Sequence, residues 1–225
     1  MATETISPTM RRYAAEIYRL QQDQEDVALA DISEHVETSP QAVSRMVKRL
    51  KKGGYLNHEL YRGVRLTPEG EKMAMPALRR HRLVENFLVK AMAYNWAEAH
   101  EYADTFELGI NDVLEDRIDE LTGHPTRCPH GEPIPNKNGV MPEVNDVPLI
   151  EVETGWQVRI SRVRTHEYDK LMYFAELDMV PGKEFYFRGC APFKGPLRLY
   201  MDNKDVILGH ELATALWVEL VEKKE

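Results

Sequence analysis

The sequence from Val27 to Leu66 reads VALADISEHVETSPQAVSRMVKRLKKGGYLNHELYRGVRL, and it predicts a helix-turn-helix followed by a two-stranded wing. Apolar residues at helical spacing over 27–36 indicate a short first helix. A second helix begins at Ser39-Pro40, because serine is a favourable N-cap and proline fits the first helical position. Gly53-Gly54 ends this helix, since glycine accepts the left-handed conformation of a C-cap.

The residues after Gly54 predict the wing. Tyr55-Leu56 and Val64-Arg65-Leu66 flank a polar tip that carries a glycine turn at 61–63. The second helix is expected to bury an apolar stripe, and its basic residues lie on or beside the opposite face. The stripe consists of Val43, Met46, Val47 and Leu50.

The distribution of charged residues in this unit indicates what it binds. Residues 39–65 carry seven Lys and Arg against one acid, Glu59, in a chain whose net charge is −8. A basic patch on an acidic protein is typical of a surface that binds nucleic acid phosphates. The second helix of such a motif enters the major groove of DNA. Winged helices also serve as protein–protein modules, but the basic helix and the arginines of the wing favour double-stranded DNA.

The predicted DNA-binding residues fall into two groups. Residues at the start of the second helix are expected at base edges, and cations further along it and in the wing are expected at phosphates. The full set is Ser39, Pro40, Gln41, Ser44 and Arg45 at the helix start, with Lys48, Arg62 and Arg65 at phosphates.

Composition limits the class of protein. The chain has 225 residues, of which 43% are hydrophobic and 29% are charged, and this is typical of soluble globular domains. No apolar run is long enough to span a membrane, and the start shows no signal-peptide pattern. Two cysteines, Cys128 and Cys190, do not make a disulfide framework. We therefore expect a cytoplasmic protein with no membrane partner.

The middle of the chain is helical. Helical patterns follow the wing from Thr67 to about residue 93, with a kink or restart expected at Pro76, and then over 96–108 and 110–121. Residues 73–142 contain seven bases and eleven acids, so this region does not predict a second nucleic-acid surface. Three such helices are marginal alone, and they predict the interface of a homodimer.

The last part of the chain changes to strands. A connector rich in Pro, Gly and Asn covers 124–148, and short alternating strands with turn signals follow it. The strands predict a small β-barrel with a short helix over 166–176. The fold class is therefore α+β. The predicted boundaries are 1–72 for the winged helix, 73–142 for the helical domain and 143–225 for the barrel.

Ligand-type side chains in the helical region predict a metal site. His81 and Glu85 share a helix face at i, i+4, and His100 on the next helix completes a first set. Asp104 and Glu107 form a second set, with Cys128 or His130 as further ligands. Imidazoles with carboxylates suit Mn²⁺, Fe²⁺ or Zn²⁺, whereas a thiolate favours the softer metals. The alternative is a solvated helix face with no metal function.

Four motifs together resemble the diphtheria-toxin-repressor family of metal-dependent transcriptional repressors. They are the winged helix, the RRHRLVENFL helix, the HEYADTFE stripe and the CPHGEPIP connector. The stretch SPQAVSRMVKRLKKGGYL with YRGVRLTPEG resembles the manganese-responsive branch. The similarity runs from about Ser7 to Pro135 and extends weakly into the C-terminal strands, which are similar to the family's SH3-like domain.

The resemblance implies roles for individual residues. His81, Glu85 and His100 match ligands of the family's ancillary site, and Glu167 falls where the barrel supplies a further ligand. Asp104 and Glu107 match ligands of the primary, activating site. The segment with Cys128 and His130 resembles a ligand-bearing connector of some members. The resemblance and these ligand sets imply a cofactor that is Mn²⁺ or Fe²⁺, with manganese slightly preferred.

Three positions depart from the family pattern. Leu108 stands where a histidine ligand is usual, and Arg12 replaces a Met or Asp of the first helix. Lys170 replaces a second barrel ligand. Hence the primary site is expected to be absent or rebuilt with Cys128, His130 or Met10, and Arg12 could neutralise the acids there.

The sequence supports three hypotheses for function. The first is a homodimeric, metal-activated repressor that binds an operator and controls metal-ion homeostasis. The second keeps DNA binding but places a peptide or small-molecule ligand on the barrel, near Trp156, Phe185, Tyr186 and Phe187. The third is a hydrolytic metalloenzyme, but the sequence contains no HExxH, nucleophile elbow or phosphate loop. No catalytic residue is therefore predicted.

Overall fold

The computed structural model describes residues 5–59 and 61–223, and the chain divides into two compact units. Unit 1 comprises Met1–His81 with Pro135–Met141, and unit 2 comprises Arg82–Ile134 with Pro142–Glu225. The division falls inside one continuous helix, directly after His81. The boundaries expected at 72 and 142 stay a prediction.

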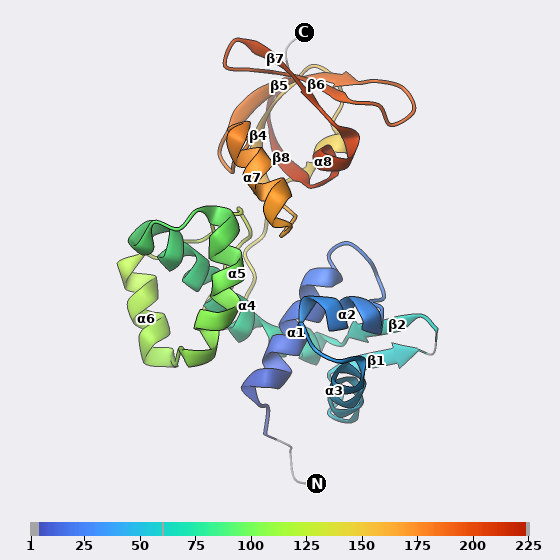
Figure 1. Cartoon of the computed structure of the whole chain (residues 1–225), viewed down its shortest axis with the longest axis vertical. Coiled ribbons are helices and arrows are strands. Elements are labelled where there is room, and N and C mark those ends of the chain that lie inside the picture. Colours follow the sequence, from blue (N-terminus) through green and yellow to red (C-terminus); the bar gives the residue numbers. More distant parts are fainter. Residues whose placement is uncertain (1–4, 60, 224–225) are drawn as a thin grey trace. The chain divides into compact units, whose positions relative to one another are not determined.

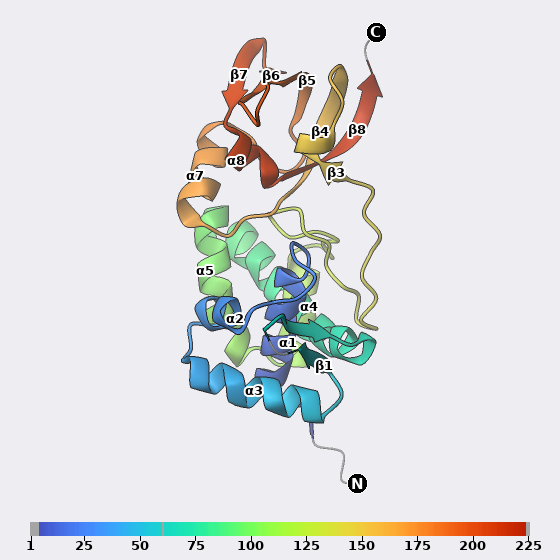
Figure 2. The ribbon, with the colours of Figure 1, turned by 90° about the vertical axis from the view of Figure 1, so that its right-hand side faces the viewer.

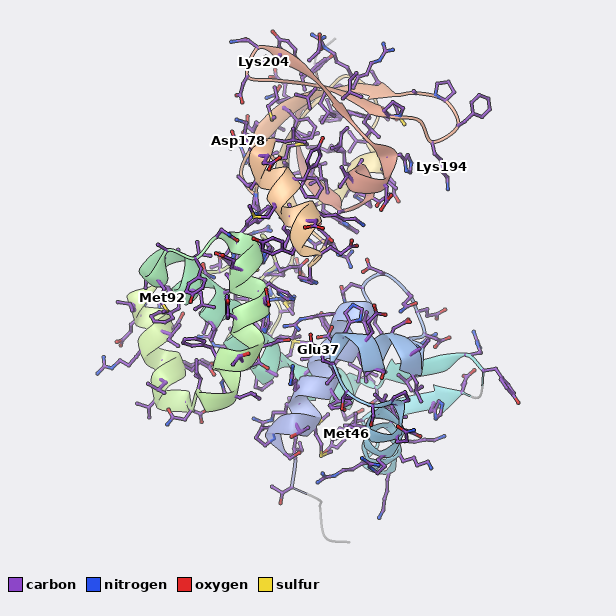
Figure 3. All side chains as sticks on the ribbon, in the orientation of Figure 1. Glu37, Met46, Met92, Asp178, Lys194 and Lys204 are labelled. Atoms are coloured by element: carbon purple, nitrogen blue, oxygen red, sulfur yellow. The ribbon has the colours of Figure 1, made fainter. Side chains whose placement is uncertain are left out.

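Unit 1 contains the expected helix-turn-helix and wing (Figure 1). The Ser39 hydroxyl caps α3 by accepting a hydrogen bond from the backbone N–H of Ala42 at 3.3 Å, and Pro40 begins the helix. Figure 3 shows Glu37 in the turn before α3 and Met46 on that helix. The elements of this unit are α1 (Pro8–Leu20), α2 (Leu29–His35), α3 (Pro40–Lys52), β1 (Leu56–Glu59), β2 (Gly63–Leu66) and the first part of α4 (Pro68–Met92).

The wing is attached to the start of the motif by the backbone. β1 pairs antiparallel with β2, and Val27 adds a bridge by exchanging two 2.9 Å backbone hydrogen bonds with Val64. Gly63 makes this approach possible, because a Cβ at that position would overlap the carbonyl oxygen of Val27. The buried stripe of α3, which includes Val43, Val47 and Leu50, packs into the same core as the wing.

Helix α4 runs unbroken through Pro76. The sequence offers a kink or a restart there. The restart is wrong, because the structure has a single helix of 25 residues, and the kink stays a prediction. Consequently the start of α4 continues the wing, while its later turns carry His81 and Glu85.

The helices of unit 2 begin at well-formed caps. Asn95 caps α5 (Trp96–Phe106) in a capping box, because its side chain accepts from Glu98 and the Glu98 carboxylate accepts from the Asn95 backbone N–H. The 3-10 turn η1 (Glu107–Gly109) follows, and Asn111 caps α6 (Asp112–Leu121).

The C-terminal part of unit 2 is a six-stranded antiparallel sheet that curls around its own core (Figure 2). Its order is β3-β8-β4-β5-β6-β7, and the expected hairpin at 197–208 is formed by β6 and β7. The elements are β3 (Val147–Pro148), η2 (Leu149–Glu151), β4 (Trp156–Val163), α7 (Tyr168–Glu176), β5 (Glu184–Cys190), β6 (Leu197–Met201), β7 (Lys204–Leu208), α8 (His210–Thr214) and β8 (Leu216–Lys223).

The barrel core contains two of the four aromatics that the second hypothesis offered as a ligand surface. Phe185 and Phe187 are buried within it. Trp96 and Ala97, the first two residues of α5, belong to the same core cluster. The start of α5 is therefore fixed by the barrel. Within the described part of the chain, no helix is long and apolar enough to cross a membrane.

Candidate DNA surface and metal centre

The start of α3 presents the predicted base-reading side chains. Ser39, Pro40, Gln41 and Arg45 are exposed and Ser44 is half-buried. One turn further on, Lys48 is also exposed. Because the opposite face of α3 is buried, these side chains form the accessible face of the helix. The helix is thus available for a major-groove contact.

The two arginines of the wing lie beside carboxylates. Arg65 donates from Nε and Nη2 to Asp26 Oδ1 at 3.2 and 3.0 Å, and its Nη1 lies 2.6 Å from Glu25 Oε1. Arg62 lies 3.0 Å from Glu59 and 3.5 Å from Asp26. The pKa of Arg65 is raised from its ordinary value, because Glu25 accepts a hydrogen bond from the guanidinium and Asp26 adds to the effect.

The predicted ligand residues of unit 2 gather in three groups. In each group the ligand atoms lie within 4.8 Å of one another. The groups are Glu85, Cys128 and His130; Glu85 and His100; and Asp104 and Glu107. His81, one turn before Glu85 on α4, is the last residue of unit 1.

The group of Glu85, Cys128 and His130 lies wholly within unit 2 and is fully buried. A tight turn presents its last two members: the N–H of Gly131 donates to the Cys128 carbonyl at 2.9 Å, and the Cys128 N–H donates to Glu132. Gly131 has a φ of +86°, and a Cβ there would overlap the carbonyl oxygen of Ser161 on β4. Only glycine therefore fits this turn against the barrel.

The connector that carries the turn is held by α4. Arg82 donates to the Pro133 carbonyl at 2.5 Å and to the Glu132 carboxylate at 3.2 Å. Asn86 donates to the carbonyl of Arg127 at 3.0 Å. Side chains of one helix thus fix the backbone on which the thiol and imidazole are mounted.

His130 has a defined orientation. Its Nε2 lies 2.9 Å from the carbonyl oxygen of Trp96, so Nε2 carries the proton and donates it. The other nitrogen, Nδ1, then presents its lone pair 3.4 Å from Glu85 Oε1 and 3.8 Å from Cys128 Sγ. A backbone carbonyl that fixes the second ring nitrogen is typical of histidine metal ligands.

The chemistry of this donor set fits a divalent cation. Burial raises the pKa of the Cys128 thiol well above its ordinary value, and the charge of Glu85 raises it further, so the thiol is protonated in the absence of a metal. Its proton can point to the Nδ1 lone pair of His130. A cation shared by thiolate, imidazole and carboxylate would replace that proton and neutralise the buried charge.

His100 approaches the cluster from α5. Its Nδ1 lies 2.8 Å from Glu85 Oε1, and its ring stacks on that of His166 with centroids 3.9 Å apart. Sequence reasoning named Glu167 as the barrel residue here. Glu167 is exposed and accepts a hydrogen bond from Lys170 at 2.8 Å, and none of the three groups found among the described residues includes it.

Asp104 lies on α5 and Glu107 in η1, and both are half-buried. Leu108, at the position where a histidine was expected, is 70% exposed. Met10, a further suggestion for a rebuilt primary site, is fully buried in the core of unit 1.

Sequence reasoning missed two contributors to the cluster. Trp96 contributes a backbone carbonyl, which no side-chain pattern can reveal. His166 is adjacent to the residue that the resemblance selected, and its ring lies 6.1 Å from that of His130. A search for every histidine next to a predicted ligand would have found it.

The end of α5, the turn η1 and helix α6 carry exposed hydrophobic side chains. Several large hydrophobic side chains are exposed there, although hydrophobic residues on a monomer's surface are usually scattered. They are Phe106, Leu108, Val113, Leu114 and Leu121.

The fold and these clusters define a winged-helix protein that also carries a buried set of metal-type ligands. Comparison with known proteins agrees along the chain. Residues 5–64 match the iron-dependent repressor N-terminal DNA-binding domain, 67–136 match the iron-dependent repressor metal-binding and dimerisation domain, and 147–220 match the FeoA domain.

Relatives are similar to this chain along nearly their whole length. The chain is 29% identical to the iron-dependent repressor IdeR of Mycobacterium tuberculosis, covering 95% of this chain and 97% of the relative. It is 27% identical to the diphtheria toxin repressor of Corynebacterium diphtheriae, covering 94% and 96%. A solved manganese-dependent transcriptional repressor in complex with manganese is 30% identical, with a TM-score of 0.86 over 94% of this chain and 100% of that one.

The chain belongs to the diphtheria-toxin-repressor family. It is a metal-dependent, DNA-binding transcriptional repressor, and because the family consists of repressors it is not an enzyme. The fold confirms the expected winged helix, helical dimerisation region and SH3-like C-terminal domain.

Proposed function

We propose that this protein is a cytoplasmic homodimer that represses genes of metal-ion homeostasis when Mn²⁺ or Fe²⁺ is bound. The proposed ligands are carried by α4, α5, η1 and the connector. They are His81, Glu85, His100, Asp104, Glu107, Cys128 and His130. Glu167 is left out, because its carboxylate is engaged by Lys170 at the protein surface.

The buried group of Glu85, Cys128 and His130 carries the proposal. A thiol, an imidazole lone pair and a carboxylate converge in a buried site, where a charged carboxylate is costly unless a cation or hydrogen-bond donors compensate it. A divalent ion would be held by these three side chains and would supply positive charge beside the contact that Glu85 makes with His100.

Manganese and iron are both compatible with this set. Carboxylates favour Mn²⁺, while the thiolate of Cys128 favours the softer Fe²⁺. We place manganese slightly first, because the manganese-dependent repressor structure is similar to this chain over its whole length. Metal content of the protein purified from cells grown with both metals would decide.

The operator is proposed to contact both parts of the winged helix. The start of α3 would enter the major groove with Ser39, Gln41 and Arg45 at base edges, while Lys48 and the wing arginines contact phosphates. Since the motif is a single unit per chain, two copies would read a near-palindromic site.

The exposed apolar surface on η1 and α6 is the proposed dimer interface. Leu108, Val113 and Leu121 are each more than 65% exposed in the single chain, and a partner would bury them. Burial of apolar side chains would stabilise the dimer at about 25 cal/mol per Å² removed from water. We propose no separate ligand for the FeoA-like barrel.

Metal and DNA binding are thermodynamically linked in this proposal. If metal increases operator affinity by some factor, operator DNA increases metal affinity by the same factor. The regulated state is thus set by metal concentration. When metal falls, the dimer would release the operator and transcription would resume.

The direct test is operator affinity measured by fluorescence anisotropy with Mn²⁺, with Fe²⁺ and with a chelator. We expect tight binding with either metal and at least tenfold weaker binding with the chelator. The Glu85→Gln variant should bind weakly under all three conditions. Equal affinity with metal and chelator would refute the metal switch and leave DNA binding intact.

A further inference from the structure

The wing arginines of unit 1 are already bound to acids of the same unit. Arg65 and Arg62, the two cations expected at DNA phosphates, face Glu25, Asp26 and Glu59. Locally, three carboxylates surround two guanidiniums. A phosphate can therefore reach these arginines only by displacing or joining a carboxylate.

The two acids next to Arg65 differ in their accessibility. Asp26 is 19% exposed in its side chain, and one oxygen accepts from both Nε and Nη2 of Arg65. Glu25 is 71% exposed and touches only Nη1, at 2.6 Å. Asp26 is thus an anchor that orients the guanidinium, whereas Glu25 occupies its outer nitrogen and can leave.

The backbone keeps both acids in place. They directly precede Val27, which exchanges two backbone hydrogen bonds with Val64 of β2. Arg65 is the next residue of that strand. The acids are consequently tied to the same small sheet as the arginine, and they would travel with the wing when it approaches DNA.

We infer that Glu25 occupies, in the free protein, the position on Arg65 that a DNA backbone phosphate takes in the complex, so that Glu25 is an internal competitor of DNA. The inference rests on the proposed DNA-facing role of the wing. Asp26 is the positioning residue for the same guanidinium. An exposed ion pair is weak and screened by salt, so DNA can break it.

The competitor reduces binding to every DNA sequence, because it acts on a phosphate contact and reads no base. It therefore lowers the affinity for DNA that the protein has before metal binds. A repressor that must leave its operator when metal is scarce gains a lower metal-free affinity by this contact.

The test is a double-mutant cycle with Glu25→Gln, Arg65→Ala and the double variant, each with metal bound, on operator and on random DNA. Glu25→Gln should tighten both complexes by about two- to fivefold per protomer, which is the range for release of an exposed ion pair. The slope of log affinity against log salt should steepen by up to about 0.9 for the recovered phosphate contact. In the Arg65→Ala background the same change should have less than a twofold effect.

Glu16→Gln is the matched control, because Glu16 pairs with Arg19 on α1 at 2.7 Å and its loss changes the net charge equally. Tightening of the same size in Glu16→Gln, or in the Arg65→Ala background, would overturn the inference, since the effect would then be a general charge effect. No tightening by Glu25→Gln would also overturn it. If Arg65→Ala itself binds DNA as tightly as the wild type, the DNA-facing wing is refuted instead.

Discussion

The wing and the turn that carries Cys128 and His130 differ in the burial and pairing of their ionisable side chains. In the wing, Arg62 and Arg65 meet carboxylates at the surface, and the side chains of Glu59 and Glu25 are each more than 60% exposed. In the turn, Cys128 and His130 are withdrawn from solvent together with Glu85. One region balances its charge with side chains of its own, and the other gathers donors that suit an added cation.

The difference teaches which contacts are exchangeable. A surface ion pair contributes little and is screened, so another anion can replace one partner at low cost. Burying a carboxylate costs free energy unless its charge is compensated. The buried group of Glu85, Cys128 and His130 is therefore selective for the ion that it binds. The wing is suited to an exchange between acid and phosphate, and the turn to selective binding of one ion.

The Glu85→Gln variant tests the selectivity of the buried group. We expect the largest effect of all here, as a loss of metal affinity. Loss of a second-sphere partner of a metal ligand costs about 10–100-fold in affinity, so loss of a ligand should cost more than about 100-fold. Titration calorimetry with Mn²⁺ measures it. Glu101→Gln, an exposed acid on α5, is the control and should bind as the wild type does. Unchanged affinity in Glu85→Gln would exclude Glu85 as a ligand.

The wing depends on its backbone attachment more than on its ion pairs, and Gly63→Ala tests this. The positive φ of +124° and the overlap with the Val27 carbonyl should together destabilise the protein by roughly 2–5 kcal/mol. Gly54→Ala is a matched control, because its φ is +79° but no atom lies within 4 Å of the added Cβ. Its cost should be only about 1 kcal/mol. Thermal unfolding measures the loss of stability in both variants. Equal losses would mean that the contact with Val27 does not matter.

The exchange expected in the buried group is that of a proton for a metal ion. Because the pKa of Cys128 is raised, the thiol is neutral near pH 7 and becomes a thiolate only when metal binds. One proton is therefore released, and metal affinity should rise about tenfold per pH unit while the free thiol stays protonated. Calorimetry in buffers of different ionisation enthalpy counts that proton.

Two serine variants provide the comparison for this proton. Cys128→Ser should lose both the released proton and the steep dependence on pH. Cys190→Ser should keep both, because Cys190 is exposed on β5 and belongs to none of the ligand groups in the described part of the chain. Proton release that persists in Cys128→Ser would assign the proton to another group.

Local features of the fold could be predicted from the sequence because their causes are local. Ser39-Pro40 and Asn95 mark helix starts through side chains that cap the next residues. The glycine turn and alternating residues of the wing act over a few positions as well. The restart offered at Pro76 was wrong, because α4 continues through this proline, which is the ninth residue of the helix and removes one backbone hydrogen bond there.

Contacts between distant segments could not be predicted. Asp26 and Arg65 are 39 residues apart, and no spacing rule joins them. The choice between His166 and Glu167 depends on how the loop before α7 turns, and one residue decides which side chain faces His100. The structure shows a ring contact between His166 and His100, and Glu167 as a metal ligand stays a prediction.

The smallest expected effect tests whether the backbone of α5 positions the buried group. Asn95→Ala removes the capping box and should destabilise the protein by about 1 kcal/mol. Trp96, the next residue, accepts the His130 hydrogen bond, so fraying of this turn should also lower metal affinity, by less than about tenfold.

Asn111→Ala separates the two effects. It removes a similar cap, in which the Asn111 side chain accepts from Leu114 at 3.0 Å, at the start of α6. Its stability loss should match that of Asn95→Ala, while calorimetry should find its metal affinity unchanged. Equal metal affinity in both variants would mean that His130 is held by the connector alone. A loss of metal affinity in Asn95→Ala alone would mean that metal binding by the buried group depends on the start of α5 as well. The exchangeable ion pairs of the wing do not depend on distant backbone in this way.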